Sequence, residues 1–119
     1  MLRHVLLALL AVCAATGISA TAAPAAERKM TDAEARKFFN AEGCKSCHAV
    51  EEFRIGPTYQ MIAMRYQNAA PETIERLSLK VLHGGAGAWG NTPMISHPYV
   101  SIEEAERIVR WILATPKPG

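Results

Sequence analysis

The sequence predicts an all-α fold of three to five helices in one domain. Apolar residues recur at helical spacing in four segments, and each segment is bounded by capping residues or by Gly and Pro. No segment alternates polar and apolar residues as a half-buried strand does. The formal net charge is only +2, so the composition does not favour nucleic-acid binding.

The first 22 residues have the pattern of a secretory signal peptide. A basic start at Arg3 precedes an apolar run from Val5 to Ala15, and small residues at 20–22 offer a cleavage site. The apolar run is short for a membrane span, and an uncleaved anchor is the alternative interpretation. Cleavage would remove residues 1–22 together with Cys13. It would leave residues 23–30 as a flexible lead-in and residues 31–119 as the folded domain, with no membrane span.

Capping motifs and prolines predict the positions of the helices. Thr31 and Glu34 form a capping box, which predicts a helix over 32–41 that stops before Gly43. Pro57 is expected to start a second helix, and Pro71 a third that runs to His83. A second capping box, at 101–104, predicts a last helix that ends near residue 114. The apolar stripes expected on the four helices are Ala35, Phe38 and Phe39; Tyr59, Ile62, Ala63 and Tyr66; Ile74, Leu77, Leu79 and Val81; and Ala105, Ile108, Val109 and Ile112.

A Gly- and Pro-rich loop separates the third and fourth predicted helices. Residues 84–99 contain four glycines and two prolines and show no periodicity. A loop of this length is unusual in a compact domain and is usually functional. We therefore expect functional residues in it.

The stretch Gly43-Cys44-Lys45-Ser46-Cys47-His48 places two thiols and an imidazole within five positions. A structural zinc site would need a further Cys or His pair at short spacing, and His83 and His97 are too far apart to provide it. A thioredoxin-like motif would lie in a βαβ pattern, whereas this one closes a helix. A plain disulfide gives His48 no role. Covalent haem explains all three residues, because both thiols join the porphyrin and the adjacent imidazole ligates the iron.

A second axial ligand is expected on the opposite face of the iron, and Met94 is the candidate. The glycines before it and Pro93 let irregular backbone approach a flat macrocycle. Met61 and Met64 are expected on a helix as packing residues, and Met30 is expected to be loose. His83 is interpreted as a solvated residue at a helix C-terminus. His97, in the same loop as Met94, is the alternative ligand.

Four motifs of this sequence, in the order in which they occur, resemble those of a short bacterial class I cytochrome c. They are GCKSCH after a helix bearing Phe39, GPTY at 56–59, WGNTPM at 89–94 and EAERIVRWIL at 104–113. The resemblance covers nearly all of residues 32–114. It implies an all-α class I cytochrome c fold wrapped around one covalently bound haem c, held by Cys44 and Cys47 with His48 and Met94 as axial iron ligands.

The resemblance also implies roles for residues around the haem. Pro57 would offer its carbonyl to the ring N–H of His48. Trp89 would donate its indole N–H to a haem propionate, and Lys80 lies where a basic partner of that group is common. Phe39 and Trp111 would pack where the first and last helices cross. The ordinary alternatives are a helix start for Pro57, a core position for Trp89 and a solvated charge for Lys80.

His97 departs from the family pattern, in which an Asn often follows the ligand Met by three residues. We expect either a surface His or a ring that approaches the Met94 sulfur or a propionate. In the second case the reduction potential would vary with pH near the titration of His97.

The function implied by the resemblance is periplasmic electron transfer, without enzyme activity of its own. The expected partners are redox proteins, such as a periplasmic dehydrogenase, a cytochrome complex or a terminal oxidase or reductase, and the expected state is a monomer. One alternative is a tightly bound cytochrome subunit of a periplasmic dehydrogenase that oxidises sulfite or an alcohol, for example. A haem sensor or enzyme with a displaceable ligand is the other.

Overall fold

The computed structural model describes residues 20–119 of the chain, and the predicted signal peptide therefore lies largely outside the described residues. Four α-helices and two short 3₁₀ helices follow one another, with no strand between residues 20 and 119. The elements are η1 (Ala25–Glu27), α1 (Asp32–Ala41), η2 (Cys44–Ser46), α2 (Tyr59–Arg65), α3 (Pro71–His83) and α4 (Ile102–Leu113). The predicted all-α fold is confirmed. Within the described part of the chain, no helix is long and apolar enough to span a bilayer.

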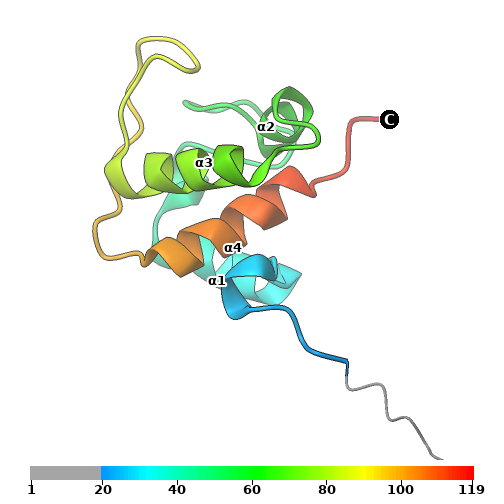
Figure 1. Cartoon of the computed structure of the whole chain (residues 1–119). Coiled ribbons are helices and arrows are strands. Elements are labelled where there is room, and N and C mark those ends of the chain that lie inside the picture. The colour runs from blue at the N-terminus through cyan, green and yellow to red at the C-terminus, as the bar shows by residue number, and fades with distance from the viewer. Residues whose placement is uncertain (1–19) are drawn as a thin grey trace, which may run out of the picture.

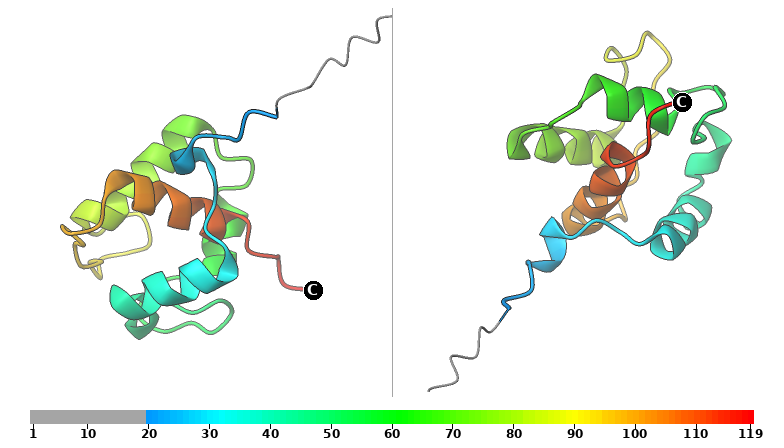
Figure 2. Two further views of the ribbon diagram at one scale, coloured as in Figure 1. Left: turned by 90° about the horizontal axis from the view of Figure 1, so that it is seen from below. Right: turned by 90° about the vertical axis from the view of Figure 1, so that its right-hand side faces the viewer.

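Helices α1 and α4 pack against each other, and in Figure 1 α4 passes in front of α1. Figure 2 gives two further views of the same arrangement. Both begin at the predicted capping boxes, where Thr31 and Ser101 accept hydrogen bonds from the backbone N–H groups of Glu34 and Glu104. The ring of Phe39 on α1 meets that of Trp111 on α4 edge to face, with centroids 5.3 Å apart. The predicted packing of these two aromatic residues is therefore present. Met30, Ala35, Phe39, Tyr59 and Ile108 form the buried cluster at this crossing.

An ion pair fastens α1 to α4 beside this crossing. Arg107 Nη2 lies 2.7 Å from Glu34 Oε1, and the other oxygen of Glu34 accepts the backbone N–H of Thr31. The Thr31 hydrogen bond and the neighbouring guanidinium lower the pKa of Glu34 to about 2. The carboxylate therefore stays ionised while it caps one helix and contacts the other.

The segment before α1 differs from its expectation. Met30 is buried, with only 4% of its surface exposed, and its backbone N–H donates to Arg107 O on α4 at 3.2 Å. Arg110 Nε donates to Ala26 O at 3.1 Å. The prediction that Met30 is loose is wrong, because its side chain packs in the buried cluster with Phe39 and Ile108 and its backbone is bonded to α4.

Two details of the middle helices also differ from the sequence predictions. Pro57 does not start α2, because the Thr58 hydroxyl accepts the N–H of Met61 at 3.0 Å and Thr58 is the N-cap. On α3, Leu79 is 40% exposed, so it lies off the apolar stripe. The buried residues of that helix are Ile74 and Ser78, and the Ser78 hydroxyl is satisfied by Ile74 O at 2.8 Å. Pro71 starts α3 and Gly84 caps it, as predicted.

The predicted loop joins α3 to α4 without regular structure. Gly85 and Met94 exchange two backbone hydrogen bonds, from Gly85 N to Met94 O at 2.9 Å and from Met94 N to Gly85 O at 3.1 Å. Gly87 N donates to Gly90 O at 2.8 Å and closes the tip. Figure 1 shows this loop in yellow, rising above the C-terminal end of α3. The two ends of the projecting segment are therefore held together at Met94.

Candidate functional site

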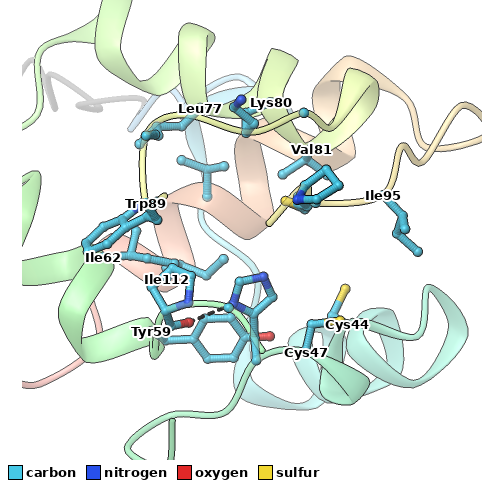
Figure 3. Close-up of a pocket in the computed structure, with 18 of the residues that line it drawn as sticks. Cys44, Cys47, Tyr59, Ile62, Leu77, Lys80, Val81, Trp89, Ile95 and Ile112 are labelled. Carbon is cyan, nitrogen blue, oxygen red and sulfur yellow. Dashed lines mark hydrogen bonds between the residues drawn. The ribbon is translucent and has the colours of Figure 1, made fainter. Parts of the chain in front are cut away.

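A largely apolar cavity of about 210 Å³ lies between the helices and the Gly-rich loop. Its walls include Tyr59 and Ile62 from α2, Leu77 and Val81 from α3, and Val109 and Ile112 from α4. The predicted site residues Cys44, Cys47, His48, Pro57, Lys80, Trp89 and Met94 all line it. In Figure 3, Cys44 and Cys47 lie on one side of the cavity and Trp89 on the other. The fold thus brings together residues that are up to 50 positions apart in the sequence.

The Cys-x-x-Cys-His stretch forms one tight turn. Gly43 has a φ of 70°, a left-handed conformation that ends α1 and that glycine adopts without strain. The 3₁₀ turn η2 follows, and His48 N donates to Cys44 O at 2.9 Å. Burial raises the pKa of the Cys44 thiol to about 11. The turn therefore presents both sulfur atoms and the imidazole to the same cavity.

The imidazole of His48 is held by Pro57. Its Nδ1 lies 2.7 Å from Pro57 O, and because a carbonyl only accepts, Nδ1 carries the proton in this contact. This assignment leaves Nε2 with a free lone pair, as a metal ligand requires. The Tyr59 ring stacks on the imidazole, with centroids 5.8 Å apart. The contact that the family resemblance implied for Pro57 is present in the structure.

Gly56 is a further residue of the site that sequence reasoning missed. A Cβ at this position would lie 2.5 Å from Cε1 of His48, so any larger residue would displace the ring. Its N–H also donates to Cys47 O at 2.8 Å. The Gly-Pro pair at 56–57 was the available signal, since it brings two successive stretches of backbone close to the His48 ring.

Met94 is the methionine that faces this cavity among those the structure describes. It lies at the base of the projecting loop, between its backbone contacts to Gly85. Met30 is in the core beside α4, and Met64 is 38% exposed on α2. The donor set around the cavity, two thiols, an imidazole and a thioether, fits a covalently attached haem with two axial ligands.

Replacement of Gly84 with alanine is expected to destabilise the loop that carries Met94. A Cβ at Gly84 would lie 2.4 Å from Met94 O and 2.8 Å from the carbonyl carbon of Ile95. Gly87 is the matched control, since it also has a positive φ but no atom within 4 Å of its Cβ position. We expect Gly84→Ala to cost about 3 kcal/mol or more and Gly87→Ala about 1 kcal/mol. Equal losses in denaturant titrations of the two holo variants would contradict this.

The rim opposite the cysteines carries polar groups. Trp89 and Lys80 both border the cavity, together with Arg76. Arg65 places its guanidinium over the Trp89 ring, 4.5 Å from the centroid, and donates from Nη1 to Ala88 O. The role of Arg65 was not predicted, and nothing in the local sequence signals it. The cation–π contact and the hydrogen bond fasten the Gly-rich loop to α2.

His97 differs from both expectations for it. Its side chain is buried, with the residue 7% exposed, so it is not a surface histidine. Its Nδ1 lies 3.1 Å from Val81 O and its Nε2 lies 3.2 Å from Glu42 O. Both ring nitrogens therefore face backbone carbonyls rather than the Met94 sulfur. This geometry also disfavours His97 as the alternative iron ligand.

Comparisons with known proteins show the family to which the chain belongs. Residues 32–116 match the family model Cytochrome c. The chain is 39% identical over 71 residues to cytochrome c-551 of Allochromatium vinosum, an alignment that spans 60% of this chain and 74% of that protein. It is 32% identical over 77 residues to cytochrome c-551 of Azotobacter vinelandii, spanning 65% of this chain and 92% of that protein.

A solved structure shows the same fold. The crystal structure of Nitrosomonas europaea cytochrome c552 superposes with a TM-score of 0.62 and 30% sequence identity, over 68% of this chain and 99% of that one. The family match covers the helices, the Cys-x-x-Cys-His turn and the Met94 loop. The chain thus belongs to the cytochrome c family, as a short class I member with an all-α fold and one covalently attached haem c.

Proposed function

We propose that this chain is a periplasmic one-electron carrier in which Cys44 and Cys47 hold the haem and His48 and Met94 are the axial iron ligands. The observation that carries the proposal is that the cavity has an oriented imidazole and a thioether as its metal-binding donors, with two thiols beside the imidazole. The haem supplies an iron that alternates between the ferric and ferrous states. With both axial positions taken by protein, no iron site is left for a substrate.

The protein residues hold both proposed ligands in place in this arrangement. The Pro57 carbonyl fixes the imidazole plane and makes His48 a stronger ligand. The two hydrogen bonds between Gly85 and Met94 hold the thioether segment at the base of its loop. A methionine ligand raises the reduction potential relative to two nitrogen ligands. These features suit a carrier that accepts electrons from reduced enzymes.

Trp89 and Lys80 are proposed to bind haem propionate. Both line the rim of the cavity, the indole offers one N–H, and the lysine offers a positive charge. Arg65 and Arg76 lie close by, and Arg65 covers one face of the Trp89 ring. An anionic group on this side of the cavity would therefore meet donors and positive charge.

Electron transfer is proposed to pass through the cavity edge that the Gly-rich loop borders. Ala86, Ala88 and Ile95 border the cavity there, and Ile95 is 66% exposed. Small and apolar side chains permit brief, weak docking of a redox protein, which is typical of electron-transfer encounters. The proposed partners are a periplasmic dehydrogenase, a cytochrome complex or a terminal oxidase or reductase.

The alternative role of a tightly bound dehydrogenase subunit uses the same haem chemistry. Purification of the native protein separates the two roles, because a shuttle is recovered as a free monomer and a subunit with its enzyme. A haem sensor or enzyme would instead require a displaceable ligand. Rapid binding of carbon monoxide to the ferrous protein at neutral pH would favour that class.

The test of the proposed function is an absorption spectrum of the wild-type protein after export with its haem attached. We expect a c-type reduced-minus-oxidised spectrum, a haem that stays with the chain in denaturant, and the weak ferric band at the red end of the visible range that marks Met–iron ligation. Carbon monoxide should bind slowly. A spectrum without the Met–iron band would contradict the assignment of Met94 and move the sensor or enzyme class forward.

A further inference from the structure

We propose that His97 is a positioning residue that caps the C-termini of α1 and α3 together, and so fixes the Met94 loop relative to the haem-attachment turn. This inference rests on the proposed function, in which Met94 is an axial ligand. It assigns to the imidazole a role in holding a ligand in place, rather than contact with the ligand itself.

The first part of the argument is the end of α3. Gly84 N still donates to Lys80 O at 2.8 Å, but Gly85 N turns away to Met94 O. The Val81 carbonyl thereby loses the amide that would continue the helix. His97 replaces it, because its Nδ1 lies 3.1 Å from Val81 O.

The backbone of His97 takes part in the same cap. Its N–H donates to Leu82 O at 3.1 Å, so one residue serves two successive carbonyls at the end of α3. These contacts join the far end of the Met94 loop back to the helix from which the loop departs. The position of Met94 is thus set on one side by Gly85 and on the other by His97.

The second part is the end of α1. The Nε2 atom of the same ring lies 3.2 Å from the carbonyl oxygen of Glu42, which is the C-cap residue of that helix. Glu42 is two residues before Cys44. A single buried imidazole therefore spans from the turn that carries the cysteines to the helix end from which the Met94 loop starts.

The chemistry of the ring limits what can replace it. Carbonyl oxygens only accept, so each contact is a hydrogen bond only where the facing nitrogen carries a proton. The neutral imidazole carries one N–H and donates to one of the two carbonyls at a time, and only the imidazolium form donates to both. Replacement with an apolar residue would remove the ring donor from two partly buried carbonyl groups. We expect the loop to relieve this by moving away, which takes Met94 off the iron.

The test measures how easily Met94 is displaced from the ferric holoprotein. Imidazole added to the solution competes for the Met94 position, so its affinity reports local opening of the loop. For His97→Phe, which keeps a ring but has no donor, we expect the imidazole affinity to rise by roughly tenfold. For His97→Gln, which keeps an amide donor, we expect a rise of no more than roughly threefold. The control His83→Asn changes an exposed residue at the end of α3 and should stay close to wild type.

Two outcomes would overturn the proposal. Imidazole affinity in His97→Phe equal to that of the wild type would show that the ring does not hold the loop. An equal rise in the Phe and Gln variants would show that a hydrogen-bond donor at position 97 does not hold the loop. Failure of the proposed function is distinguishable from both, since the wild type would then lack the Met–iron band before any substitution.

A second measurement needs no variant and covers the case in which His97→Phe does not fold. In the ferrous wild-type holoprotein, NMR spectra should show at least one His97 ring N–H proton that exchanges slowly with solvent. Burial of the ring between two carbonyls predicts this protection. Rapid exchange of every His97 ring N–H proton would count against the cap.

Discussion

Met94→Ala is expected to abolish the ferric Met–iron band and to lower the reduction potential by on the order of 100 mV, since axial ligands shift haem potentials over about 0.8 V. Met94 lines the cavity that His48 also lines. His97 is not a ready replacement, because both of its ring nitrogens face carbonyls. The variant should therefore expose the iron to water and to added ligands. Absorption spectra and a redox titration measure both effects.

Met64→Ala is the matched control for this substitution. Met64 is on α2, and 38% of its surface is exposed, so its removal should leave both the band and the potential near wild-type values. A band that persists in Met94→Ala would mean that another residue supplies the sulfur. A band that is lost in both variants would indicate a general loosening of the fold rather than loss of a ligand.

The helix boundaries were largely predictable because local interactions define them. The capping box at Thr31 and the left-handed Gly43 limit α1 to Asp32–Ala41, as expected. Pro71 at the first turn and Gly84 at the C-cap do the same for α3. The start of α2 was misplaced because Pro57 and Thr58 both suit a helix start, and the hydrogen bond from Met61 N to the Thr58 hydroxyl decides between them.

The grouping of the two cysteines, His48 and Pro57 at the cavity was predictable for a different reason. The cysteines and His48 are adjacent in the sequence, and Pro57 lies nine residues from His48 in a short connection. The partners of His97 lie 16 and 55 positions away, and Arg65 meets a carbonyl 23 positions away. Such contacts depend on how the helices pack, so the spacing of residues in the sequence does not predict them. The burial of Met30 and its backbone contact with α4 also depend on how the helices pack.

The double substitution Cys44→Ser and Cys47→Ser is expected to remove the covalent haem and, with it, most of the folded structure. Many apolar side chains line the cavity, among them Ile62, Leu77, Val81 and Ile112. The buried cluster that the described residues form at the crossing of α1 and α4 is small. The free energy of unfolding of a domain of this size is small. Loss of a large bound group that only the folded state can hold removes its whole contribution to stability.

The two single variants are the controls for this prediction. Each keeps one thiol, so each should retain haem through a single bond and show a cooperative thermal transition at a lower temperature than the wild type. For the double variant we expect far-UV circular dichroism to lose roughly half or more of the helical signal at 25 °C. Helices of this length are only marginally stable without tertiary packing. Without the haem, the side chains that line the cavity have nothing to pack against, so the helices should unfold. A native-like spectrum with a cooperative transition would show instead that the cluster of Met30, Phe39, Tyr59 and Ile108 folds the chain alone, and that the haem adds only its redox chemistry.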